Sequence, residues 1–323
     1  MTEMRYMDAV NRALVDAMQA DQTVIVYGED VALPGGPFRL TRDLLEKFGA
    51  ERVRDTPISE ATIVSAAVGA AMCGLRPVVE IMFMDFITLA MDGLVNQAAK
   101  ARFMFGGQCN VPMVVRTAHG AGINAGPQHS QCLEAWLAHV PGLKVVCPSN
   151  AADAYTLLRA AIADPDPVIF VENRALYSRK WEVDLDATAV IGRAHVARAG
   201  SDVTVVTYGA TTHAALAAAE SLAVENIQVE VIDLRSIQPW DQAAVFASVA
   251  RTHRVVIAHE AVQAFGVGAE IAASIGEHAF DELDAPVVRV GAPFMPVPYT
   301  PALEKDYLPG SAAIIAGIRK TIA

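Results

Sequence analysis

The sequence lacks the features of a secreted, membrane-spanning or nucleic-acid-binding protein. It has 4 cysteines in 323 residues and no CxxC pair, so no disulfide framework is indicated. It has no cluster of Lys and Arg, and a formal net charge of −11 disfavours nucleic acid or an anionic membrane as a partner. No apolar run is long enough to span a membrane, and the segment 1–22 carries both signs of charge, unlike a signal or transit peptide. We therefore expect a cytoplasmic protein with reduced thiols.

Three common ligand-binding motifs are also missing. The chain has no GxGxxG after its first expected strand, no GxxxxGK[ST] and no GxSxG, which disfavours dinucleotide, P-loop and hydrolase functions. Charged residues make up 19% of the chain, less than the usual share of about a quarter. We therefore expect part of the surface to be buried against other subunits.

What the sequence does contain is an alternation of short apolar strands with helical stretches, and 53% of its residues are apolar. Continuous apolar strands separated by helices are typical of a parallel sheet covered on both faces. The first series has strands at 23–27, 77–83, 111–117, 143–148 and 167–172, and the second at 202–209, 227–234, 254–260 and 286–291. Between the two series, residues 173–195 are polar and irregular, which indicates an interdomain crossing.

The fold class that these patterns predict is α/β, with two domains that each have a mostly parallel sheet and helices on both faces. We place the first domain at residues 1–185 and the second at 186–323. Expected helices of the first domain include 60–73 and 85–104.

The most informative candidate site residue is Glu60. It opens an uncharged, small-residue helix after Pro57 and the N-cap candidate Ser59, and Gly74 ends that helix. Because the helix is apolar on every side, we expect it to be buried all round, with Glu60 poorly solvated and able to exchange protons near neutral pH. The alternative is that Glu60 only complements the helix dipole.

Two further features follow expected strands. Phe86 lies at a strand-to-helix junction, where an aromatic ring could stack on a planar heterocycle or pack in the core. The Gly-rich loop 117–136 carries His119 and His129, and histidine is suited to proton transfer at neutral pH. These two residues and His139 lack the spacing of a zinc site.

Weaker signals are two acid-containing strand ends. Glu29 and Asp30 end the first strand, and His259 and Glu260 end a strand of the second domain. Each pair could belong to a site, or could satisfy neighbouring backbone groups.

Along nearly its whole length, the chain resembles the β subunit of the thiamine-diphosphate-dependent E1 component of 2-oxo acid dehydrogenase complexes. The matching segments are GEDV at 28, RDTPISE at 54–60, AAVGAAMCGLRPVVEIMFMDF at 66–86, NQAAKARFMFGG at 96–107, QHSQ at 128–131, HVPGLKVVCPS at 139–149 and DPVIFVEN at 166–173. DLR at 233–235 and HE at 259–260 match the second, transketolase-C-terminal-like domain.

The resemblance implies a pyrimidine-binding first domain and roles for particular residues. Glu60 matches the glutamate that hydrogen-bonds the cofactor's N1′ and so promotes attack on the keto carbon of a 2-oxo acid. Phe86 matches the aromatic residue that stacks on the pyrimidine, and Ile58 an apolar residue of the same pocket. His129 matches the histidine that manages protons during acyl transfer to the lipoyl arm of E2, and Glu29 an acidic residue near the cofactor.

The resemblance also implies partners and metal ions. Family members bind the diphosphate and Mg²⁺ through a GDG-type motif on the α subunit, and this chain has no GDG. It is thus expected to form an active site with E1 α in an α2β2 heterotetramer that serves E2. Ala161, Asp164 and Asp166 match a potassium site. Relatives usually carry an Asp near the position of Phe294, in the region that faces E2. This chain departs from them there.

Two other interpretations stay open. A non-catalytic structural subunit would have the same fold, but would have no reason to retain Glu60, Phe86 and His129. A self-contained transketolase-like enzyme would bind the cofactor without a partner. For the substrate, the segments FMFGG and PMVVRT favour a pyruvate or acetoin type over a branched-chain 2-oxo acid.

Overall fold

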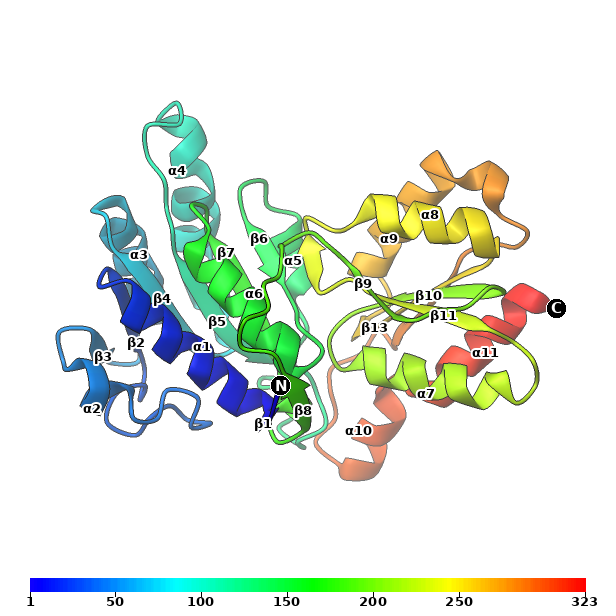
Figure 1. The fold of residues 1–323 in the computed structure, drawn as a ribbon, viewed down its shortest axis with the longest axis horizontal. Helices are drawn as coiled ribbons and strands as arrows, with labels where there is room; N and C mark the ends of the chain where they lie inside the picture. Colours follow the sequence, from blue (N-terminus) through cyan, green and yellow to red (C-terminus); the bar gives the residue numbers. More distant parts are fainter. The chain divides into compact units, whose positions relative to one another are not determined.

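The computed structural model describes residues 1–323, and none of its helices combines the length and apolarity that a membrane crossing needs. The chain forms two compact units (Figure 1). The first comprises residues 1–119 and 136–191, and the second comprises 120–135 and 192–323. The chain therefore passes to the second unit for good at 191/192, six residues beyond the expected boundary at 185/186. Residues 120–135 of the Gly-rich loop also belong to the second unit.

The first unit is built on a parallel sheet whose strands lie in the order β6-β7-β5-β4-β2-β3. Its interior strands are rich in Val and Ile and buried, as the continuous apolar runs predict. The strands of the sheet, with the mostly exposed β3 at its edge, are β2 (Val24–Gly28), β3 (Val53–Asp55), β4 (Arg76–Phe83), β5 (Val114–His119), β6 (Lys144–Val146) and β7 (Val168–Asn173).

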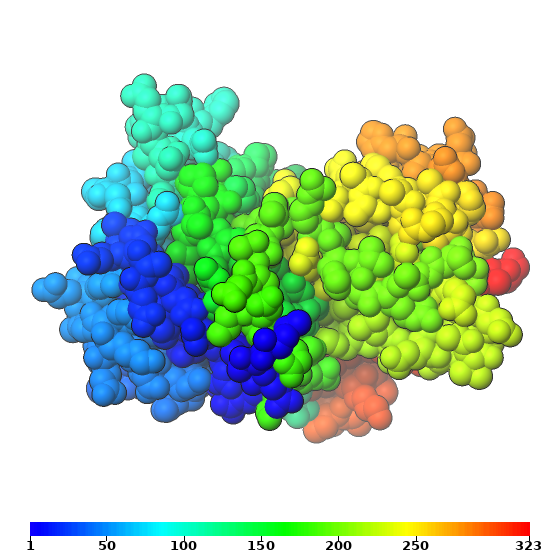
Figure 2. Space-filling model, viewed as in Figure 1, coloured from blue at the N-terminus to red at the C-terminus, as the bar shows by residue number.

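The helices of this unit cover both faces of the sheet. α1 (Tyr6–Ala20) and α6 (Ala151–Ala163) lie side by side on one face, as the blue and green segments of Figures 1 and 2 show. α3 (Glu60–Met72) packs against β4 and against the helical turns that follow it. The short helices are α2 (Leu44–Phe48), α5 (Glu134–Ala138) and η3 (Arg174–Leu176).

Two stretches differ from the sequence prediction. The expected helix 85–104 consists of a 3₁₀ helix η1 (Met84–Ala90), a π-helix η2 (Asp92–Ala98) and α4 (Ala99–Met104). The stretch 173–195 is not irregular throughout, because β8 (Lys180–Val183) pairs antiparallel with β1 (Thr2–Arg5).

The second unit has a smaller sheet in the order β14-β13-β10-β11-β9, in which only β9 is antiparallel. Helices α7 and α11 cover one face and α8 and α9 the other (Figure 1). The strands of this sheet are β9 (His195–Arg198), β10 (Val203–Thr207), β11 (Val229–Asp233), β13 (Val255–Val262) and β14 (Val288–Ala292), and the short strand β12 (Ser236–Gln238) lies outside it. The helices are α7 (Thr211–Ala223), α8 (Gln242–Thr252), α9 (Val267–His278), η4 (Phe280–Glu282), α10 (Pro301–Tyr307) and α11 (Ser311–Ile322).

The core of the second unit packs Val side chains of the sheet against alanines of α7 and against Ile314 and Ile318 of α11. Small residues on α7 let that helix lie close to the sheet. The predicted fold class, two α/β domains with mostly parallel sheets and helices on both faces, is confirmed.

Candidate functional site

A carboxylate-rich edge forms where β2 and β3 end in the first unit. The Thr56 N–H donates to the Gly28 carbonyl at 2.9 Å, which joins the GEDV segment to the segment that leads into α3. The Asp55 carboxylate accepts the N–H groups of Ala32 and Leu33 at 2.6 and 3.1 Å and holds the loop that follows Asp30. Carboxyl ends of parallel strands are where ligands of such sheets bind.

Glu60 is the first residue of α3 and is buried, with 8% of its surface exposed. The expected burial of α3 on every side is wrong for this chain, because Ala61, Ser65 and Gly69 lie on an exposed face. The helix is therefore buried only on the side that packs against its own domain. Ser59 occupies the N-cap position but makes no side-chain capping bond, since its hydroxyl donates to the Pro57 carbonyl at 3.2 Å.

Glu29 is half-buried and follows β2 directly. Burial raises the pKa of Glu29, and the negative charges of Asp30 and Glu60 raise it further. The structure thus places Glu60 near enough to Glu29 for its charge to act on the Glu29 carboxyl group.

The two apolar candidates differ in exposure. Phe86 lies in η1, is half-buried, and packs edge-to-face on Phe83 with ring centroids 5.8 Å apart. Phe83 in turn packs on Phe38 at 5.6 Å, so the position of the Phe86 ring is supported from behind. Ile58 is 75% exposed in the turn before α3.

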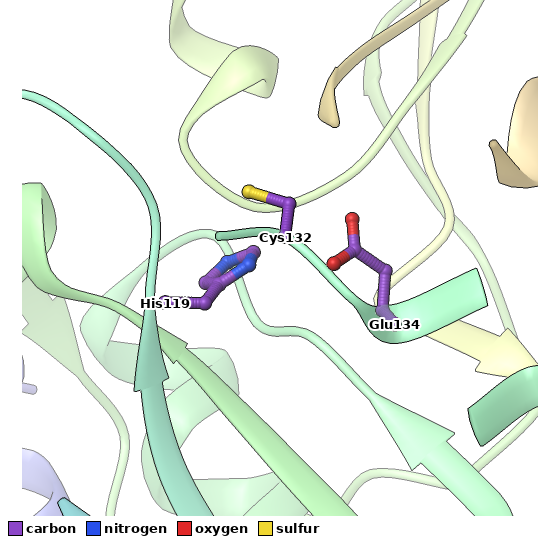
Figure 3. A group of neighbouring side chains, drawn as sticks. All are labelled: His119, Cys132 and Glu134. Atoms are coloured by element: carbon purple, nitrogen blue, oxygen red, sulfur yellow. The ribbon is translucent and has the colours of Figure 1, made fainter. Parts of the chain in front are cut away.

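The two candidate histidines belong to different units. His119 ends β5, is 3% exposed, and has its Nε2 3.8 Å from the Cys147 Sγ. His129 is half-buried on the Gly-rich loop of the second unit. Figure 3 shows His119 at its strand end and Cys132 and Glu134 on the segment that enters α5.

The residues expected to bind potassium lie at the opposite edge of the first sheet, where α6 ends and β7 begins. The Asp164 carboxylate accepts two bonds of 2.7 Å from Lys144, and Asp166 pairs with Arg102 at 2.6 Å. The Ala161 carbonyl accepts the Asp164 N–H at 3.3 Å. Potassium binding by these groups stays a prediction.

Sequence reasoning missed a buried ion network in the first sheet. Arg116 on β5 donates to Glu172 on β7 at 2.7 and 3.0 Å and to Glu80 on β4 at 2.7 Å. Tyr177 donates to Glu172 at 2.8 Å. Burial raises the pKa of Glu172 although Arg116 opposes the shift. The signal was present, because each of these three apolar strands carries a charged residue among its buried positions.

Family comparisons match both units. The transketolase pyrimidine-binding domain model matches residues 2–180, and the transketolase C-terminal domain model matches residues 192–314. A solved structure described as a split-gene transketolase, an inactive β4 tetramer, superposes with a TM-score of 0.83 over 99% of this chain and 98% of that one. Its sequence identity is 23%, so it supports the fold alone.

Sequence relatives are more specific. The pyruvate dehydrogenase E1 component subunit beta-1 of Arabidopsis thaliana is 47% identical, over 98% of this chain and 89% of that protein. The acetoin:2,6-dichlorophenolindophenol oxidoreductase subunit beta of Bacillus subtilis is 45% identical, over 96% of this chain and 94% of that protein. The chain belongs to the family of β subunits of the E1 components of 2-oxo acid dehydrogenase complexes, built from a transketolase pyrimidine-binding domain and a transketolase C-terminal domain.

Proposed function

We propose that this β subunit takes part in the thiamine-diphosphate-dependent oxidative decarboxylation of a 2-oxo acid of the pyruvate type, or in acetoin cleavage, and in transfer of the acyl group to the lipoyl group of E2. The single observation that carries the proposal is the buried Glu60 carboxylate beside Glu29 at the carboxyl edge of the first sheet. This is the part of the site that a pyrimidine would need from this chain.

The residues present fit the pyrimidine end of the cofactor. Glu60 offers a poorly solvated carboxyl group that can share a proton with N1′, donating to the ring nitrogen or accepting from it once it is protonated. Phe86 offers a ring held in place by Phe83, on which a heterocycle can stack. When bound, thiamine diphosphate supplies a nucleophilic carbon and an electron sink for decarboxylation. Glu60 would hold the proton at N1′.

Partner chains are part of the proposal. Ile58, Phe103 and Met104 are 75%, 90% and 70% exposed, and one face of α3 is uncovered. Apolar surface of this kind supports an E1 α partner in an α2β2 heterotetramer. We place Mg²⁺ on that α subunit because this chain has no GDG motif. Docking of E2, a potassium ion at Ala161, Asp164 and Asp166, and a cytoplasmic location also stand as proposals.

The competing function is a non-catalytic structural subunit of the same fold. It requires the fold but not the cluster of Glu60 with Glu29. A branched-chain substrate is the other alternative.

The test is reconstitution with an α subunit, thiamine diphosphate and Mg²⁺, followed by rates for pyruvate, acetoin and branched-chain 2-oxo acids with a dye as electron acceptor. We expect turnover of pyruvate or acetoin, with branched-chain acids slower. Absence of turnover with every substrate, in a tetramer shown to be assembled, would favour the structural subunit.

A further inference from the structure

We propose that Glu304, on α10 of the C-terminal domain, is a positioning residue that anchors the loop carrying His129. This inference rests on the proposed function, because it gives Glu304 a part in acyl transfer to the lipoyl group. All of its contacts lie within the second unit.

The loop is held along its backbone by two buried carboxylates. Both Glu304 oxygens accept the Asn124 N–H at 3.1 Å, across 180 residues of sequence. One oxygen of Glu260, on β13, accepts the Ala121 N–H at 2.6 Å. Hydrogen bonds that end on a carboxylate are the stronger class. The N-terminal half of the loop is therefore anchored to two different elements of the domain.

Further contacts hold the rest of the loop. The Tyr208 hydroxyl donates to Glu134 at 2.8 Å, where the loop enters α5. A Cβ at Gly126 would lie 2.1 Å from the Tyr299 ring, so the loop backbone passes directly against that ring. The His129 N–H donates to the Gly126 carbonyl at 3.4 Å. His129 thus lies in a stretch of the loop that is held on both sides.

Packing alone does not fix the loop. A pocket of about 410 Å³ borders it at Pro127 and Gln131, with Phe294 and Met295 among the lining residues. Room of this size beside the loop lets its backbone move unless polar contacts hold it. The hydrogen bonds to Glu304 and Glu260 must therefore hold the loop backbone in place, as tight packing does elsewhere in a protein.

A carboxylate at position 304 has no other evident purpose. Glu304 is 3% exposed and its helix packs through Tyr307 against Ala121, Ala292 and Val297, so the surroundings are apolar. Burying a carboxylate in such surroundings is unfavourable unless hydrogen bonds compensate it. The Asn124 N–H is the compensating donor, which means that the site is built around the loop.

The test compares two reactions of the reconstituted α2β2 enzyme. One is 2-oxo acid decarboxylation with a dye acceptor, and the other is reductive acylation of a lipoyl domain from E2. The variants are Glu304→Ala, which removes the acceptor, Glu304→Gln, which keeps an acceptor oxygen, His129→Ala, and the double variant His129→Ala/Glu304→Ala. Asp306→Ala, an exposed position on the same helix, is the matched control.

We expect Glu304→Ala to lower the ratio of lipoyl rate to dye rate by about tenfold or more, since a displaced catalytic group can cost on the order of a hundredfold. Glu304→Gln should restore most of the ratio, Asp306→Ala should leave it unchanged, and the double variant should be no worse than His129→Ala. The proposal is overturned if Glu304→Ala leaves the ratio unchanged, if Glu304→Gln behaves like Glu304→Ala, or if the two losses multiply.

A second measurement does not depend on activity. Amide hydrogen exchange on the wild-type tetramer should show Asn124 and Ala121 protected, and Glu304→Gln should keep that protection. Free exchange at both amides contradicts the anchoring even where Glu304→Ala fails to fold. An inactive wild-type enzyme with protected amides would refute the proposed function and leave the anchor in place.

Discussion

Replacing Arg116 by Met should destabilise the first domain far more than the loss of an ordinary ion pair. The guanidinium is 2% exposed and makes bonds of 2.7, 3.0 and 2.7 Å to two carboxylates that are 1% and 7% exposed. Removing one partner of a buried pair leaves an uncompensated charge and costs about 3–5 kcal/mol. For a domain of this size each kcal/mol lowers Tm by roughly 2–4 °C. We therefore expect Tm to fall by about 6–20 °C.

The pKa of Glu172 determines how the loss of Tm should depend on pH. Burial raises the pKa of Glu172 even with Arg116 present, so the folded state holds a proton more tightly than the unfolded state. Stability from such a group is present below the unfolded pKa and lost as the pH rises through the folded pKa. Without Arg116 the pKa rises further. The loss of Tm should therefore be larger at about pH 8 than at about pH 5.

Calorimetry of the full chain measures both effects. Lys180→Met, which breaks the exposed pair of Lys180 with Glu3, is the control and should change Tm little. The triple variant Arg116→Met/Glu80→Gln/Glu172→Gln removes the charges together and should recover part of the loss. A drop in Tm for Arg116→Met no larger than for Lys180→Met, or one that is larger at low pH, would contradict the stabilising role of the buried ion network.

Three further predictions concern packing, a buried histidine and the metal. Gly142→Ala should lower Tm more than Gly74→Ala. Both positions have positive φ, but a Cβ at Gly142 would clash with the Ala99 carbonyl oxygen, whereas nothing lies within 4 Å of a Cβ at Gly74. Equal losses of Tm would contradict this. Burial lowers the pKa of His259, so the stability that this residue contributes should fall as the pH drops below about 6.5. His259→Phe keeps the stack on Tyr208 and should make Tm depend less on pH in that range. An unchanged dependence of Tm on pH would contradict this. If the potassium site is real, KCl should raise Tm above equal NaCl, and Asp164→Ala should abolish the difference, whereas equal Tm values in both salts would remove the site.

The sequence predicts the parallel strands well because a strand buried on both faces needs a continuous apolar run, as in 77–83 and 167–172. It does not predict β1 and β8, since a short polar ribbon at the surface has no hydrophobic pattern. The apolar composition of α3 predicts burial on every side, whereas only the side that packs against its own domain is buried. The contact of Glu304 with Asn124 joins positions too distant in sequence for any local pattern to reveal.

We propose that Glu60 acts on the cofactor's pyrimidine, and replacing it by Gln in the α2β2 enzyme tests this role. Gln keeps the size of the side chain but cannot hold a proton as the carboxylate does. The rate of 2-oxo acid decarboxylation with a dye acceptor should fall by about a hundredfold or more, as for loss of general acid–base catalysis. Exposed Glu51→Gln should leave it unchanged. A Glu60→Gln enzyme as fast as wild type would contradict the account.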